Sequence, residues 1–163
     1  MHLHLPFKVD ANACIDYMSV MIPSDLTIAA WANLVRAHRV ALLAVENRLK
    51  AADLPPLAWY DALLELERGE GGPLRPFELE QAMLLSQSNV SRLVDRLEEA
   101  GYLEKRQCPM DGRGTFLSIT ASGKAMRRRM WTVYAAAIED AVGAKLSKGE
   151  ARTAAALLRK LSV

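Results

Sequence analysis

The chain has 163 residues, of which 51% are hydrophobic and 25% charged, and its formal net charge is +2. This length suffices for one domain with its own core, and the composition is that of a globular protein. No uninterrupted apolar run is long enough to cross a bilayer, and the start of the chain lacks the apolar segment of a secretory signal. We therefore expect a cytoplasmic protein that does not bind a membrane.

The first helix is predicted over residues 25–52, after an N-terminal extension formed by residues 1–24. Its apolar side chains recur at helical spacing and line one stripe: Trp31, Leu34, Val35, His38, Leu42, Val45 and Leu49. The pair Pro55-Pro56 ends the following connection. A second helix then begins, with Trp59, Tyr60 and Asp61 in its first turns.

A helix-turn-helix is predicted next. A short helix opens at Pro76, which suits a first helical turn, and can pack Phe77 and Leu79 inward. A tight connection through Leu84 and Leu85 joins it to a second helix. No glycine marks this turn, so the motif is predicted from the hydrophobic pattern alone.

The second of these helices has the pattern of a DNA recognition helix. Four apolar residues recur at i, i+3, i+4 and i+7 and face a core: Val90, Leu93, Val94 and Leu97. Ser86 stands at the N-cap position, and Gly101 stands where the helix stops. The opposite face carries small polar residues and arginines, which suit close contact with phosphates and base edges.

A β-hairpin follows, with strands predicted over residues 102–106 and 115–119. The connection contains Pro109, Gly112 and Gly114, which favour turns. Between residues 86 and 130 stand nine basic and five acidic residues, a net charge of +4, so the remainder carries −2. A basic segment of this kind is typical of a phosphate-contacting surface.

Two further helices complete the chain. Thr120 is the expected N-cap of a long helix that runs to about Gly143, and Ser147 with Glu150 forms a capping box for the last helix. A winged-helix core cannot cover the apolar surface of these helices and of the first one. We therefore expect a two-fold homodimer in which the first and last helices interleave; a monomer that folds them onto the wing domain is the alternative.

These elements, in this order, resemble the MarR family of bacterial winged-helix transcription regulators. The family's wing signature is an Asp, one residue, an Arg and a variable run ending in Leu-Thr. It matches Asp111, Arg113 and Thr120, with Ile119 in place of the Leu. The resemblance implies a mainly α fold with a small β wing: residues 57–120 as the winged helix-turn-helix domain, and residues 25–56 and 121–163 as N- and C-terminal dimerisation helices.

The expected function is sequence-specific regulation of transcription, most simply repression, by a homodimer on a pseudo-palindromic operator in double-stranded DNA. Asn89, Ser91 and Arg92 are the predicted base readers. Arg113 would enter the minor groove, while the resemblance implies that Asp111 braces the wing through an arginine such as Arg106 or Arg96. The full predicted DNA-binding set is Ser86, Gln87, Ser88, Asn89, Ser91, Arg92, Arg96, Lys105, Arg106, Asp111, Arg113 and Lys124.

An effector site is predicted where the first helix, the second helix and the recognition helix converge. Its candidate residues are Trp31, His38, Trp59, Tyr60 and Asp61, with Arg92 or Arg96 beside them. The resemblance implies a small aromatic or phenolic effector that releases the DNA. The alternative assigns Trp59 and Tyr60 to the core, His38 to a hydrogen-bonded buried site, and Asp61 to an ion pair with an arginine.

Two other functions remain open from the sequence. Cys14 or Cys108 would make the protein a redox-responsive regulator, although no resolving partner is evident and the two form neither a disulfide framework nor a metal-binding spacing. A winged-helix dimer could also use its basic face to bind a protein. No catalytic triad, phosphate-binding loop or zinc spacing is present, so we expect no enzyme, no metal and no cofactor.

Overall fold

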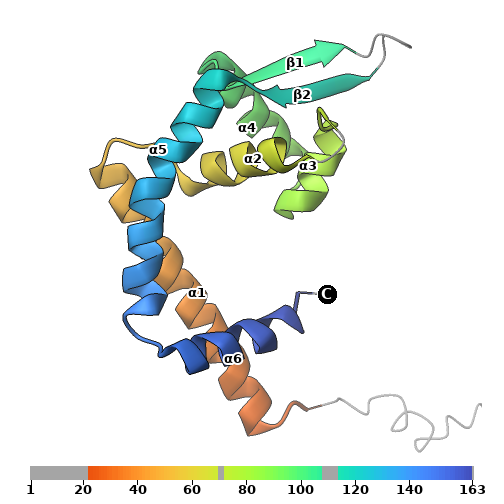
Figure 1. The fold of residues 1–163 in the computed structure, drawn as a ribbon. Coiled ribbons are helices and arrows are strands. Elements are labelled where there is room, and N and C mark those ends of the chain that lie inside the picture. Colours follow the sequence, from red (N-terminus) through yellow and green to blue (C-terminus); the bar gives the residue numbers. More distant parts are fainter. Residues whose placement is uncertain (1–21, 70–71, 108–113, 163) are drawn as a thin grey trace, which may run out of the picture. The chain divides into compact units, whose positions relative to one another are not determined.

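The structure is a computed structural model that describes residues 22–69, 72–107 and 114–162. Figure 1 shows the order of its elements: α1 (Asp25–Ala51), α2 (Leu57–Arg68), α3 (Pro76–Met83), α4 (Gln87–Glu99), β1 (Leu103–Gln107), β2 (Thr115–Ile119), α5 (Ala121–Ile138), the π-helix η1 (Glu139–Gly143) and α6 (Lys148–Arg159). The chain has two units, which divide between Ala37 and His38. The mainly helical fold with a two-stranded wing is as the sequence predicts.

The first core lies among α2, α3, α4 and the hairpin. Its side chains are all buried: Ala62, Leu63, Leu66, Leu79, Val90, Leu93, Val94, Leu97, Leu103 and Leu117. The predicted apolar stripe of α4 faces this core in full. We call these elements, residues 57–119, the winged-helix core; they hold α4 by one face and leave its other face to solvent.

Two glycines shape the end of α4 and the hairpin. Gly101 has φ +73°, so the helix stops where the sequence predicts, in a conformation that favours glycine. At Gly123, a Cβ atom would lie 2.2 Å from the Tyr102 carbonyl oxygen, so only glycine lets α5 approach this turn. β1 and β2 pair antiparallel with Leu103 opposite Ile119. Leu74 extends the sheet through two backbone hydrogen bonds with Leu117.

The α3–α4 turn has a feature that the sequence did not reveal. Leu84, which caps α3, has φ +52° and ψ +35°, the left-handed conformation that glycine or asparagine adopts most easily. Its side chain is 92% exposed. The chain therefore makes the tight helix-turn-helix connection with a strained leucine.

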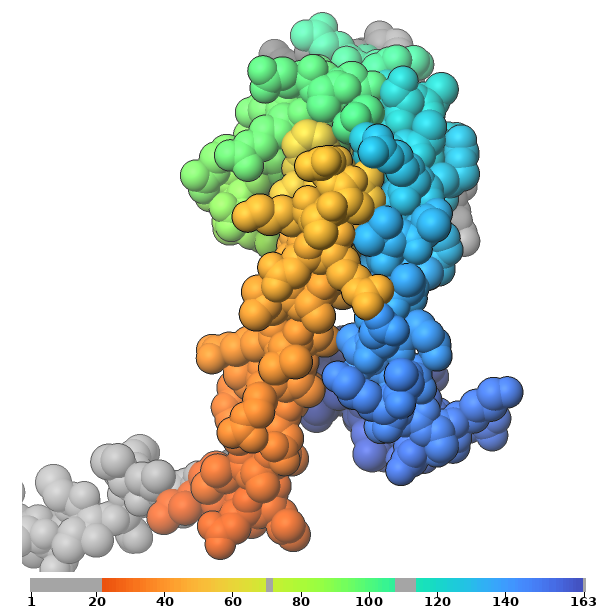
Figure 2. Space-filling model, turned by 90° about the vertical axis from the view of Figure 1, so that its left-hand side faces the viewer, coloured from red at the N-terminus to blue at the C-terminus, as the bar shows by residue number. Residues whose placement is uncertain are grey.

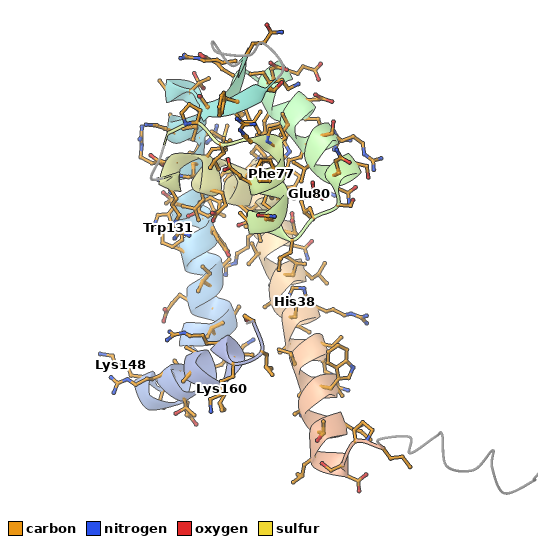
Figure 3. All side chains as sticks on the ribbon, turned by 90° about the vertical axis from the view of Figure 1, so that its right-hand side faces the viewer. His38, Phe77, Glu80, Trp131, Lys148 and Lys160 are labelled. Atoms are coloured by element: carbon orange, nitrogen blue, oxygen red, sulfur yellow. The ribbon has the colours of Figure 1, made fainter. Side chains whose placement is uncertain are left out.

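A second core joins α2, α5 and the part of α1 from His38 onward. Its buried members are Val45, Leu49, Leu54, Leu57, Tyr60, Met130 and Ala137. The ring of Trp131, which Figure 3 labels, stacks on that of Tyr60 with 6.0 Å between the ring centres, and Arg127 of α5 pairs with Glu67 of α2. Figure 2 shows α5, in blue, beside the end of α1, in orange. Since α2 contributes to both cores, it connects them.

Most of the helix caps predicted from the sequence are present in the structure. Thr120 accepts a hydrogen bond from the Gly123 amide, and Ser147 with Glu150 forms the predicted capping box. The helix begun at Thr120 does reach Gly143, but its last turn is the π-helix η1. The α2 N-terminus follows Pro56, which offers no side-chain cap; instead Glu46 of α1 accepts from the Leu57 amide at 3.1 Å.

Helix α1 is long and apolar enough to span a membrane, judged by length and composition alone. Its sequence is nevertheless interrupted by Arg36 and Arg39. A helix at a protein–protein interface has the same composition, so this measure does not by itself make α1 a membrane span.

Candidate nucleic-acid interface

Core packing on one side of α4 determines which residues of the helix face solvent. Because Val90, Leu93, Val94 and Leu97 are buried, the polar residues between them face outward. Every described member of the predicted DNA-binding set is exposed: Ser86, Gln87, Ser88, Asn89, Ser91, Arg92, Arg96, Lys105, Arg106 and Lys124. Ser86 occupies the N-cap position as predicted, although its hydroxyl lies 3.3 Å from that of Ser88 and caps no backbone amide.

Arg92 is folded back along α4. Its Nε donates to the Ser88 carbonyl oxygen, and its Nη2 donates to Asn89 Oδ1, each at 3.1 Å. Two predicted base readers are therefore hydrogen-bonded to each other before any DNA is present. A guanidinium held this way loses less side-chain entropy on binding.

Lys105 connects the wing to the recognition helix. Its Nζ lies 2.6 Å from Asp95 Oδ1 and 2.7 Å from Glu98 Oε2, so β1 is tied to α4 at two carboxylates. The hydrogen bonds that Lys105 donates to Asp95 and Glu98 raise its pKa above the ordinary value. The sequence predicted Lys105 as a phosphate contact. The structure gives it two acidic partners, which fit a residue that positions the wing.

The other basic residues on or near the wing have different surroundings. Arg106 pairs with Glu104 of its own strand at 2.8 Å, and Lys124 is exposed in the first turn of α5. Arg75, which the sequence reading missed, places its guanidinium 5.1 Å from the Phe116 ring centre. Asp111 and Arg113 lie outside the described residues, as do Cys14 and Cys108.

Two cavities flank α4. A cavity of about 510 Å³ lies between α3, α4 and the hairpin; Gln87, Ser91 and Lys105 are in its lining. A second, of about 360 Å³, lies between the start of α2 and α4. Trp59, Asn89, Arg92 and Arg96 are in its lining, together with Leu85. The predicted readers thus divide between the two sides of the helix.

The predicted effector residues do not all meet in one of these cavities. Trp59 lines the second one and packs edge-on against Tyr102. His38 lines a different, apolar groove of about 290 Å³ with Tyr134. Tyr60 is buried in the second core, in line with the alternative reading of that residue.

Asp61 and Trp31 complete the predicted effector set. Asp61 is half-buried; burial, and then the charges of Glu65 and Glu46, raise its pKa. Trp31 belongs to the unit that ends at Ala37, whereas the other four residues belong to the unit that begins at His38.

Among the described residues, no group of three or more His, Cys, Asp or Glu side chains is arranged to hold a metal ion. The described geometry offers instead an exposed polar and basic helix face beside a two-stranded wing. That arrangement defines a winged helix-turn-helix protein.

Comparison with known proteins places this winged helix in one family. A model described as MarR family matches residues 52–114. The transcriptional repressor MprA of Escherichia coli K12 is 32% identical over 89 residues, which are 55% of this chain and 51% of MprA, so the chain spans about half of that relative. An uncharacterised HTH-type transcriptional regulator of Bacillus cereus is 31% identical over 107 residues, 64% of this chain and 69% of that protein. The chain belongs to the MarR family, whose relatives named here are transcription regulators and not enzymes.

Solved structures agree on the fold. Sco3205, a MarR family regulator of Streptomyces coelicolor solved in complex with DNA, has a TM-score of 0.77 and 23% identity, covering 86% of this chain and 92% of that one. BpsR of Bordetella bronchiseptica, whose DNA binding is regulated by 6-hydroxynicotinic acid, has a TM-score of 0.73 and 21% identity, with 83% and 99% covered. At these sequence identities, the similarity to the solved structures shows a shared fold and nothing further.

Proposed function

We propose that the protein binds duplex DNA as a homodimer in the cytoplasm and represses transcription from the site it occupies. The observation that carries this proposal is the exposed polar and basic face of α4, held beside the wing by the winged-helix core in a chain of the MarR family. Small polar groups at the start of such a helix suit base edges, and the arginines suit guanine and phosphate. The complex of Sco3205 with DNA supports the same use of this fold.

A second copy of the chain is the proposed partner of α6. This helix buries none of its residues. Leu157 and Leu158 in its last turn are 56% and 46% exposed, and Leu161 just after it is 70% exposed. Ile138 and Val142, before α6, are also exposed. Apolar patches of this kind on a soluble chain mark interaction surfaces. In a two-fold dimer, the two α4 helices would meet successive major grooves, about 34–36 Å apart.

Selection of binding sites from random duplexes tests this function. The wild-type protein is expected to enrich a pseudo-palindrome whose half-sites are about one helical turn apart. Arg113→Ala should weaken binding, chiefly at A·T-rich flanks, because an arginine in a narrow minor groove is attracted by its negative potential. Asp111→Ala should weaken binding as well, if that acid braces the wing. Failure to enrich any sequence would favour the alternative, a protein-interaction module.

The proposed effector is a small aromatic carboxylate or phenolate bound between α2 and α4. The cavity there combines the Trp59 ring with the guanidinium groups of Arg92 and Arg96, a fitting lining for an anionic ring. A ligand in this place would cover Asn89 and Arg92, so it would compete with DNA directly. The regulation of BpsR by 6-hydroxynicotinic acid supports an effector of this class.

A thermal-shift screen of aromatic acids tests the effector. Ligands that raise the melting temperature should release DNA, and Trp59→Ala should abolish both effects. As a control, Trp131→Ala removes an aromatic ring from α5, and Trp131 is not among the residues that line this cavity. Release of DNA by peroxide, with no stabilising acid, would favour the alternative of redox control through Cys14 or Cys108.

A further inference from the structure

The hydrogen bond between Arg92 and Asn89 fixes which way the asparagine amide faces. Arg92 Nη2 donates to Asn89 Oδ1 at 3.1 Å, while Arg92 Nε is held by the Ser88 carbonyl oxygen. The reverse orientation of the amide would set its N–H donors against guanidinium donors, which have no acceptor. The carbonyl oxygen of Asn89 is thus turned toward the arginine, and the amide nitrogen toward the other side.

This orientation changes what Asn89 offers to a base edge. An asparagine reads adenine with both amide atoms, since Oδ1 accepts from the adenine amino group and Nδ2 donates to N7. With Arg92 at Oδ1, an approaching amino group would meet guanidinium N–H donors and a positive charge. The pair therefore presents mainly donors: the Nδ2 hydrogens of Asn89 and the remaining N–H groups of Arg92.

Base edges in the major groove differ in the partner they offer to such a donor pair. Guanine presents two acceptors, N7 and O6, and thymine presents O4. Adenine and cytosine present an amino group at the corresponding place, which is a donor. Both side chains are exposed on α4, so nothing in the described chain covers this donor pair.

We propose that Asn89 and Arg92 act as one reading unit that selects a keto base, guanine before thymine, at one position of each half-site. This specificity rests on the proposed DNA binding. It differs from two independent contacts, because Arg92 decides the base that Asn89 prefers.

The test compares site selection by the wild-type protein with selection by Asn89→Ala and Arg92→Met. The position whose preference disappears in Asn89→Ala is the one read by the unit. There the wild type should select guanine or thymine, with adenine bound about tenfold more weakly. Arg92→Met releases Oδ1 and should move the same position toward adenine. Arg129→Met, which removes an equal charge from an exposed place on α5, should keep the wild-type preference.

A second variant covers the case in which Arg92→Met binds too weakly for selection. Asn89→Asp keeps an oxygen for Arg92 and replaces the amide nitrogen by an acceptor, so the preference should move to cytosine or adenine. Adenine or cytosine at this position for the wild type would overturn the proposal, and so would an unchanged preference in both variants. If the wild type enriches no sequence at all, the proposed DNA binding fails and the reading unit fails with it. Circular dichroism of each variant confirms that α4 is folded.

Discussion

The winged-helix core and α6 use the same leucine-rich chemistry with opposite results. Leu79 and Leu97 of the winged-helix core are 0% exposed, whereas Leu157 of α6 is 56% exposed. Both helices of the comparison, α4 and α6, are amphipathic, and both carry N-cap serines. The difference lies in what covers the apolar face: α2, α3 and the hairpin cover α4, whereas no residue of α6 is buried.

The apolar residues of this sequence therefore fall into two kinds: those buried within one chain, and those that a second chain would bury. The winged-helix core buries its apolar side chains within a single chain. The leucines of α6 contribute little to a single chain, because apolar side chains stabilise only when they leave water. Their presence is explained by the proposed dimer, in which the exposed face of α6 becomes a buried one.

The largest effect is expected from charges on α6. Leu157, in the last turn of α6, and Leu161, just after the helix, are both exposed, so Leu157→Glu with Leu161→Glu would place two carboxylates in the proposed interface. Each leucine buried in a dimer contributes about 1.5–3 kcal/mol, so dissociation should be complete at micromolar concentration.

Sedimentation should show this dissociation as a fall from the dimer to the 18.0 kDa chain, with the helix content kept. Lys160→Glu, a charge change on the exposed residue that follows α6 (Figure 3), should leave the dimer intact. If the wild-type protein already sediments as a single chain, the proposal that a second copy of the chain covers α6 is wrong.

The next effect concerns the winged-helix core. Leu97→Ala should lower the free energy of unfolding by about 2–5 kcal/mol, because the side chain is fully buried and leaves a cavity. Urea unfolding in the monomeric double-Glu background measures this without the dimer equilibrium. In the same background Leu158→Ala should change the free energy by less than about 0.5 kcal/mol. Equal losses in the two variants would mean that α6 is already packed in the single chain.

Local patterns predicted most of this fold. The stripe of α4, the stop at Gly101, the cap at Thr120 and the Ser147 capping box all depend on residues within a turn or two of each other, and the structure confirms them. Long-range partners were not predictable in this way: Glu46 caps a helix 11 residues later. The π-helix η1 was also missed, because a π turn has no simple periodic signal.

In the candidate site, too, local features were predictable from the sequence and long-range contacts were not. The helical period alone placed Gln87, Ser91 and Arg92 on the exposed face. It could not show that Lys105 pairs with Asp95 and Glu98, because that contact depends on how β1 turns back after Gly101. The spacing of Asp95 and Glu98 on one helix face was the available signal, since a lysine that begins the returning strand can reach both.

A smaller effect is expected at the turn that joins α3 to α4. Leu84→Asn should raise the free energy of unfolding by about 1 kcal/mol, because a left-handed conformation costs a leucine about that much and asparagine tolerates it. Little burial is lost, since the leucine is almost fully exposed. Thermal unfolding of Leu84→Asn measures the gain, with Leu84→Ala as the control that shortens the side chain and keeps the strain. A loss of stability in Leu84→Asn would show that the leucine side chain has a partner of its own.

The smallest effect tests α2, the helix that both cores share. Asp61 lies between Tyr60 of the second core and Ala62 of the winged-helix core, and it is half-buried. Burial first, and then the charges of Glu65 and Glu46, raise its pKa. A carboxyl whose pKa is raised by folding stabilises the protein fully below its unfolded pKa of about 3.9, and this contribution is lost as the pH rises through the folded pKa.

Asp61→Asn should therefore raise the free energy of unfolding at pH 7 by about 0.5 kcal/mol, and the advantage should disappear at about pH 3, where the wild-type carboxyl is protonated. Urea unfolding of both proteins at the two pH values measures the difference. In a Glu65→Gln background the gain at pH 7 should shrink, because one of the charges that oppose Asp61 is gone. If Asp61→Asn instead destabilised the protein at pH 7, the ionised carboxylate would have a favourable partner, and the junction of the two cores would be held by charge as well as by packing.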